Sequence, residues 1–238
     1  MFVFLSNLLL GVLGLIFGSF ISALSYRYPR GMSVSRGRSI CPNCKKQIYW
    51  FDNIPLVSFI LLGGRCRNCK KPISWRYPLI EIVSGIGFLL IGPNILNLVL
   101  FLILLTIFII DFEHQIIPDL LVFLGMLISI FNLQFTIYNS LLAGLLAATF
   151  LLLIHIATRG RGMGLGDVKF AVFGGMIVGL NLAAIWMLLA FLTGATVGII
   201  LIIGKKVVLK SQIAFGPFLI IAIPIALICG EKIISVLL

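Results

Sequence analysis

Stretches of about 20 apolar residues recur along this chain of 238 residues, and each is long enough to cross a bilayer as an α-helix. Hydrophobic residues make up 61% of the sequence and charged residues only 11%, a composition far from that of soluble domains. We therefore predict an all-α polytopic membrane protein. The length suits one compact helical bundle with one soluble insert.

Eight apolar segments are predicted to span the membrane. They cover approximately residues 3–25, 77–92, 94–111, 117–133, 138–158, 168–180, 182–204 and 213–230. The sixth segment is short, because thirteen helical residues rise only about 20 Å against a hydrocarbon core of roughly 30 Å. It is expected to be tilted, to thin the bilayer locally, or to belong to a broken pair that turns near Gly179 and Asn181.

The positions of the basic residues predict how the chain is oriented in the membrane. A polar insert over residues 27–76 holds eleven Lys and Arg residues and a single acid, Asp52, so it carries almost all of the net charge of +11. The positive-inside rule places this insert in the cytoplasm and the N-terminus outside. With eight crossings, every remaining cation except Lys169 and Lys232 also falls in a cytoplasmic loop. The predicted domains are a first helix at 1–26, this insert, and a membrane core at 77–238.

The insert contains two Cys-x-x-Cys pairs separated by 21 residues, Cys41 with Cys44 and Cys66 with Cys69. Pairs of this kind place four thiolates for tetrahedral zinc in a ribbon-like fold that buries too little apolar surface to be stable alone. Four cysteines leave no open coordination position, so the zinc would be structural. Stable disulfides do not suit a cytoplasmic loop. The remaining alternatives are a redox pair or four free thiols.

An apolar stretch, residues 51–64, lies between the two cysteine pairs and is too short to span a membrane. It is expected to form either the core of the ribbon or a segment at the membrane interface. The surrounding cations favour anionic lipid headgroups. Nucleic-acid binding is not expected, because a basic helix with interleaved aromatic residues is missing from the insert.

Two aspartates border apolar segments, where ionisable residues are costly and suggest function. Asp111 closes the third segment, and Asp167 follows a glycine-rich loop that begins at Arg159. The predicted topology places both at the cytoplasmic membrane surface. The loop glycines Gly162, Gly164 and Gly166 are expected to provide positive φ angles and close backbone approach, which would aim Asp167.

Two aspartates held close together share a proton, so one can deprotonate a water molecule while the other protonates the leaving group. Asp111 and Asp167 are therefore predicted to form a catalytic pair that hydrolyses amides. One alternative is that both simply cap helix ends. A second is a divalent metal site. Its ligands would be Asp111, Glu113, His114 and Asp119. Lys169 is expected either to fold back onto Asp167 or to extend to the interface.

Several motifs occur in one order along nearly the whole chain. The segment Asp111-Phe112-Glu113-His114-Gln115-Ile116-Ile117-Pro118-Asp119 matches a helix-end pattern Asp-x-Asp-x-x-x-(Ile/Leu)-Pro-Asp, with Glu113 for the second Asp. Gly164-Leu165-Gly166-Asp167 matches a Gly-x-Gly-Asp signature. The cysteine pairs, Gly18-Ser19-Phe20, Arg76-Tyr77-Pro78-Leu79-Ile80-Glu81 and Phe215-Gly216-Pro217 also fit. With these motifs the chain resembles the type IV prepilin peptidases of pilus, type II secretion and competence systems.

The resemblance implies a bifunctional enzyme of the bacterial plasma membrane. It implies that Asp111 and Asp167 are the catalytic aspartates. They would cut the basic leader from prepilins or pseudopilins on the cytoplasmic side, just after a glycine. It also implies that the new N-terminal residue is methylated with S-adenosylmethionine, an activity associated with the cysteine insert. The residues that bind this cofactor are not apparent from the sequence.

Two other kinds of protein were considered. A small ion or proton transporter would need polar residues near the middle of facing segments, whereas here they gather at one surface. A presenilin-like intramembrane protease shares the Gly-x-Gly-Asp signature but does not need the four cysteines. A peptidase without methyltransferase activity is the remaining alternative.

Overall fold

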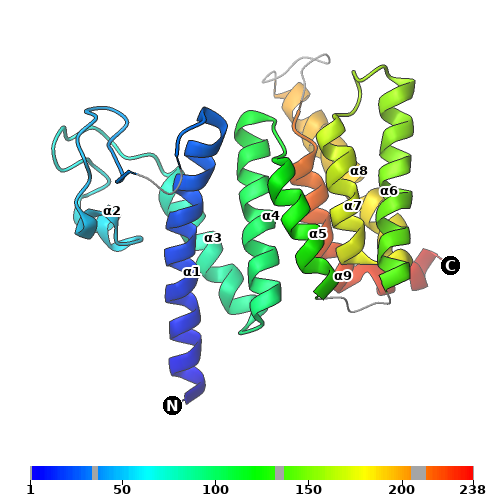
Figure 1. Cartoon of the computed structure of the whole chain (residues 1–238), viewed down its shortest axis with the longest axis horizontal. Coiled ribbons are helices and arrows are strands. Elements are labelled where there is room, and N and C mark those ends of the chain that lie inside the picture. The colour runs from blue at the N-terminus through cyan, green and yellow to red at the C-terminus, as the bar shows by residue number, and fades with distance from the viewer. Residues whose placement is uncertain (1, 34–36, 132–136, 205–212, 238) are drawn as a thin grey trace. The chain divides into compact units, whose positions relative to one another are not determined.

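The computed structural model describes residues 2–33, 37–131, 137–204 and 213–237, and in these ranges every regular element is a helix (Figure 1). The longer helices are α1 (Phe2–Arg27), α3 (Arg76–Ile91), α4 (Ile95–His114), α5 (Asp119–Phe131), α6 (Ile137–Ala157), α7 (Leu165–Val178), α8 (Leu180–Ile203) and α9 (Gly216–Leu237). The insert contains the short helix α2 (Val57–Leu61) and two 3-10 turns, η1 (Tyr28–Arg30) and η2 (Trp50–Asn53). The all-helical prediction is confirmed.

Five helices, α1, α4, α6, α8 and α9, are long and apolar enough to cross a membrane. The chain is thus a multi-pass membrane protein. The other three predicted segments also form helices, but α3, α5 and α7 have only 16, 13 and 14 residues. Eight crossings are therefore not confirmed. Residues 205–212, in the predicted cytoplasmic loop between the seventh and eighth segments, and the last two residues of segment 117–133 lie outside the described residues.

The short sixth segment is half of a broken pair, one of the three predicted alternatives. Helix α7 ends at Val178 and α8 begins at Leu180, so Gly179 alone separates them. Its φ of 78° lies in the left-handed region that side chains disfavour. The 14 residues of α7 rise only about 20 Å, so its first residues and the turn at Gly179 are about 20 Å apart.

The chain forms two compact units, Met1–Thr106 and Ile107–Leu238, and the boundary falls inside α4. In the first unit α1 packs closely on α3 because two glycines one turn apart leave room. A Cβ on Gly14 would come 2.7 Å from the carbonyl oxygen of Ser84, and one on Gly18 would come 2.7 Å from Cα of Glu81. Small residues at this spacing let helix backbones approach in membranes.

Polar contacts join α3 to α1 and the insert to α3. The guanidinium of Arg76 donates to the Ser22 carbonyl at 3.0 Å and to Ser25 Oγ at 2.7 Å. The buried carboxylate of Glu81 accepts the backbone N–H of Leu56 at 2.8 Å. Leu56 has a φ of 57°, a backbone conformation that a leucine side chain disfavours. The hydrogen bond to Glu81 therefore stabilises this turn.

In the second unit, α6 packs on α7 and α8 on α9. A Cβ on Gly175 would come 2.6 Å from Cα of Gly144, so α6 and α7 meet backbone to backbone. The indole N–H of the fully buried Trp186 donates to the Leu219 carbonyl at 2.8 Å and ties α8 to α9. These contacts hold the helices of the second unit against one another.

Candidate functional site

Asp111 lies in the last turn of α4, which continues three residues beyond the predicted end of the segment. Only 4% of its surface is exposed. Its Oδ2 atom is buried and has no hydrogen-bond partner in the part of the chain that the structure describes. A buried polar atom without a partner is costly, and such atoms gather at functional sites.

Asp167 lies in the first turn of α7 and is partly buried. Its Oδ2 accepts the backbone N–H of Gly164, the residue that precedes the helix, at 3.1 Å. The carboxylate therefore satisfies one of the unpaired amides at the helix end, as the capping alternative proposed. The same bond fixes the direction of the side chain, so capping and a catalytic role are compatible.

Close packing explains the glycines before Asp167. Gly160 does have a φ of 75°, but Gly162, Gly164 and Gly166 do not have positive φ, so that part of the prediction is wrong. The expected close approach is present. A Cβ on Gly166 would come 3.2 Å from the Cβ of Ile117, nearer than side chains normally approach.

Ile117 contacts both halves of the candidate site. It packs on Gly166, next to Asp167, and on Gly216, the first residue of α9. A Cβ on Gly216 would come 2.5 Å from Oδ2 of Asp111 and 3.3 Å from Cδ1 of Ile117. The charges of the two carboxylates interact. The second unit thus brings the two aspartates together around one isoleucine and the start of α9.

The sequence reasoning gave Gly216 no individual role. Its backbone stands at the N-terminus of α9, where the helix dipole favours a nearby negative charge, and the nearby charge is the Asp111 carboxylate. Gly216 is more than one hundred residues from Asp111 along the chain. Its presence in the Phe215-Gly216-Pro217 motif was the only signal that could have found it.

Lys169 does not fold back onto Asp167, and its extension to the membrane interface stays a prediction. Its Nζ lies 2.8 Å from both carboxylate oxygens of Asp119, so it links the start of α7 to the start of α5. Both side chains are largely exposed, which limits the stabilisation from this ion pair to about 1 kcal/mol or less. The bond still joins the first turn of α7, which carries Asp167, to a neighbouring helix.

His155 fastens the loop that leads to Asp167. Its Nδ1 lies 2.7 Å from the carbonyl oxygen of Met163, which is buried. Thr158 Oγ1 accepts the N–H of Gly162 at 3.0 Å. The end of α6 therefore holds the backbone of the loop from two sides.

The metal alternative at the acidic residues finds no support. Among the described residues, the only group of His, Cys, Asp or Glu side chains that converges on a possible metal position is the four cysteines. The proposed acidic ligands Asp111, Glu113, His114 and Asp119 form no such group, and Asp119 is paired with Lys169 instead.

The two cysteine pairs fold into nearly identical turns. In the first, the N–H of Cys41 donates to the Lys46 carbonyl and the N–H of Lys45 donates to the Cys41 carbonyl, both at 2.9 Å. Cys66 repeats these bonds with Lys71 and Lys70, again at 2.9 Å. Each turn needs one lysine with positive φ, 59° in the first and 57° in the second. Repeated turns of this kind present both thiols of a pair to the same side.

The four sulfurs fit one metal ion. They lie within 4.8 Å of one another, and Cys41 Sγ is 3.9 Å from Cys69 Sγ. Tetrahedral zinc with Zn–S bonds of about 2.3 Å needs sulfurs about 3.8 Å apart. The backbone N–H of Cys69 and that of Asn68 lower the pKa of the Cys66 thiol to about 7, although burial raises it. A backbone bond from Lys71 lowers the pKa of the Cys69 thiol, but burial and the neighbouring cysteine side chains raise it to about 11. Amides that stabilise a thiolate favour metal binding.

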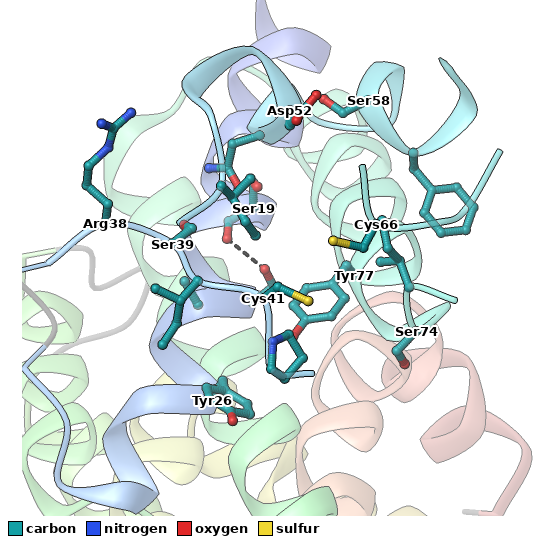
Figure 2. A pocket seen from close by; sticks show the side chains of 18 of the residues that line it. Ser19, Tyr26, Arg38, Ser39, Cys41, Asp52, Ser58, Cys66, Ser74 and Tyr77 are labelled. Carbon is teal, nitrogen blue, oxygen red and sulfur yellow. Dashed lines mark hydrogen bonds between the residues drawn. The ribbon is translucent and has the colours of Figure 1, made fainter. Parts of the chain in front are cut away.

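A cavity of about 780 Å³ lies in the first unit beside the cysteines. Figure 2 shows Ser19 and Tyr26 from α1, Tyr77 from α3, and Cys41 and Cys66 from the insert around it. Its size falls in the range of small-molecule sites, roughly 300–1,000 Å³. The lining combines aromatic rings with hydroxyl, amide and carboxylate groups.

The fold and the site together define a polytopic membrane protein with one pair of interacting carboxylates and one cysteine cluster that could hold a metal. Comparison with known proteins narrows this class. Residues 12–94 match the bacterial peptidase A24 N-terminal domain, and residues 98–199 match the type IV leader peptidase family.

Curated relatives agree over almost the whole chain. The chain is 30% identical to a prepilin leader peptidase/N-methyltransferase of Pseudomonas aeruginosa and 32% identical to one of Stutzerimonas stutzeri, covering 93% of this chain and 90% of each relative. It is 33% identical to one of Aeromonas hydrophila, covering 82% of this chain and 73% of the relative. No solved structure matches significantly. The chain belongs to the type IV leader peptidase family.

Proposed function

We propose that this chain is a membrane-embedded aspartic endopeptidase that removes the leader peptide of type IV prepilins or pseudopilins and then methylates the new N-terminus. The names of its curated relatives combine a prepilin leader peptidase with an N-methyltransferase. The observation that carries the peptidase assignment is the meeting of Asp111 and Asp167 around Ile117.

Hydrolysis at this site is acid–base catalysis by a carboxylate pair. The two aspartates share a proton, and one takes a proton from the attacking water as the other gives one to the departing amine. Asp111 offers an oxygen without a partner, while the Gly164 amide keeps Asp167 in place. The pair acts as one unit, so its two members have joint rather than separate titrations.

The distribution of Lys and Arg along the chain indicates on which side of the membrane cleavage occurs. The cations of the insert place residues 27–76 in the cytoplasm, and the N-terminus of α1 outside the plasma membrane. Asp111, near the end of α4, and Asp167, at the start of α7, then lie at the cytoplasmic surface. A prepilin presents its scissile bond at this depth, where a polar leader meets an apolar helix.

The insert is a structural zinc module. Cys41, Cys44, Cys66 and Cys69 hold the ion, and their spacing leaves no position for substrate. Among the described residues of the insert, Cys41 and Ser58 are the only buried ones, so apolar burial stabilises it little. The ion therefore contributes most of the stability of this module.

The cavity beside the cysteines is the site of methyl transfer. S-adenosylmethionine, when bound, supplies a methyl group to the free amine of the cut pilin. The rings of Tyr26 and Tyr77 line the cavity but already carry the guanidinium groups of Arg30 and Arg76, at 4.0 Å and 5.6 Å from the ring centroids. Ser19 and Glu81 offer hydrogen-bond acceptors. Glu81 also holds the Leu56 turn, so it shapes one wall of the cavity.

Cleavage of a co-expressed prepilin tests the proposal. Asp111→Asn and Asp167→Asn each keep the volume of the side chain but cannot share a proton, and each should lower the cleavage rate by about 10²–10⁴-fold. Glu113→Gln is the matched control, because Glu113 is exposed and two residues from Asp111, and it should cleave normally. Normal processing by either Asp variant would refute the catalytic pair.

A further inference from the structure

Helix α2 of the insert turns its apolar side outward. Val57, Ile60 and Leu61 have the spacing that places residues on one helix face, and they are 48%, 73% and 80% exposed. The polar residue between them, Ser58, is buried and donates to the carbonyls of Phe51 and Ile54. A helix in contact with water has the opposite arrangement. The sequence alternative of a ribbon core is therefore excluded for α2.

Two tryptophans extend this surface. Trp50, in the turn that contacts α2, is 74% exposed, and Trp75, whose ring lies 5.0 Å from that of Phe59, is 67% exposed. We call Trp50, Val57, Ile60, Leu61 and Trp75 the apolar face of the insert. Tryptophan is the residue most typical of the boundary between lipid and water.

The insert lies beside the membrane helices of its unit and not beyond their ends. Ile16 and Phe20 of α1 line one cavity together with Trp50 and Pro55 of the insert. Ile16 is eleven residues before Arg27, the end of α1, or about 16 Å along the helix. In Figure 1, α2 is accordingly level with the middle of α1. The apolar face thus continues the lipid-exposed surface of α1, where Ile16 and Phe20 are each 51% exposed.

The charge of the insert also suits a position at the membrane surface. It carries eleven cations against one acid, Asp52, which is already paired with Arg67 at 2.7 Å. Lys45, Lys46, Lys70 and Lys71 are exposed beside the two cysteine turns. Exposed cations on a module that also has an apolar face match an anionic leaflet, which attracts nearby cations.

We propose that the apolar face of the insert is embedded in the anionic membrane leaflet, so that the cysteine module is held against the bilayer by lipid as well as by α1 and α3. The occupant of this surface is phospholipid, with acyl chains on α2 and the two tryptophans and anionic headgroups on the lysines. The cavity beside the cysteines then opens at the lipid–water boundary, where the N-terminus of an apolar helix would emerge.

Tryptophan fluorescence of the full chain in lipid nanodiscs tests this placement. The chain has three tryptophans, and the third, Trp186, is fully buried in the second unit. Nanodiscs of phosphatidylglycerol and phosphatidylcholine would contain phospholipid brominated near the upper part of the acyl chain, and iodide would serve as the aqueous quencher. The double variant Trp50→Phe/Trp75→Phe and the matched control Trp186→Phe identify the source of the signal.

We expect bromine to quench the signal of Trp50 and Trp75 at least twofold more than iodide does. Trp186→Phe should keep this quenching and the double variant should lose it. Replacing phosphatidylglycerol by phosphatidylcholine should reduce it. Quenching by iodide and not by bromine would overturn the proposal, because the face would then lie in water. Protection from both quenchers would also overturn it, because the face would then be covered by protein.

Discussion

The cysteine cluster and the aspartate pair are built in opposite ways. Each cysteine pair is closed by backbone bonds inside a turn of about six residues, and the two turns carry nearly the same sequence. The aspartates come from two helices more than fifty residues apart, and their positions depend on Ile117 and on the start of α9. The first site is a cluster that could hold a metal ion, and the second is positioned by helix packing.

This difference predicts which kind of change should damage each site. The insert has little buried apolar surface, so its fold would depend on the zinc ion that we propose for the cluster. The aspartate pair is positioned by the packing of Ile117 on Gly166 and Gly216. Removing zinc should therefore affect the insert and methylation while leaving peptide cleavage.

The largest effect is expected from loss of two cysteines. The double variant Cys41→Ser/Cys66→Ser should lower bound zinc from about one ion per chain to none, because two sulfurs cannot hold it at nanomolar free zinc. Metal analysis of the purified protein and limited proteolysis of the insert would measure this. Cys229→Ser is the matched control, since Cys229 is exposed in α9 and outside the cluster. Unchanged zinc in the double variant would disprove the cluster.

The second largest effect, a loss of prepilin cleavage, is expected from a substitution at Gly216. Gly216→Val would place side-chain atoms against Asp111 and Ile117, and displacement of a catalytic group by about 1 Å can cost about 100-fold in rate. Prepilin cleavage should fall by that factor, while zinc content stays normal. In the control Gly198→Ala, the added methyl meets nothing closer than 3.9 Å, so cleavage should be unchanged. Equal cleavage by both variants would contradict the packing of α9 on Asp111.

A small effect is expected from the ion pair between α5 and α7. Lys169→Met should lower cleavage only a few-fold, because an exposed pair contributes about 1 kcal/mol or less. The exchanged variant Asp119→Lys/Lys169→Asp should recover most of the loss. Recovery would show that the pair positions Asp167. A loss as large as that of Asp167→Asn, with no recovery on exchange, would instead give Lys169 a direct part in the chemistry.

Local patterns in the sequence were sufficient for much of this structure. Long apolar runs located all eight long helices, and the short sixth segment correctly raised the possibility of a turn at Gly179. The spacing of the cysteines predicted a cluster because both turns close within a few residues. These features depend on neighbours along the chain.

Features that depend on packing were not accessible. The pairing of Lys169 with Asp119 joins residues 50 apart, and the contact of Gly216 with Asp111 joins residues still more distant. The expectation of positive φ at Gly162, Gly164 and Gly166 was wrong because their small size serves close contact instead. Composition also could not decide whether α2 faces inward or outward, since an apolar stretch suits both.

The most direct test of two separate sites is the mass of the pilin N-terminus produced by each variant. The double cysteine variant should yield cleaved but unmethylated pilin. Asp167→Asn should leave the precursor uncut, yet it should methylate an added peptide that already has the mature N-terminus. The account is contradicted if loss of the cysteines abolishes cleavage as completely as Asp167→Asn does, or if Asp167→Asn cannot methylate the mature peptide.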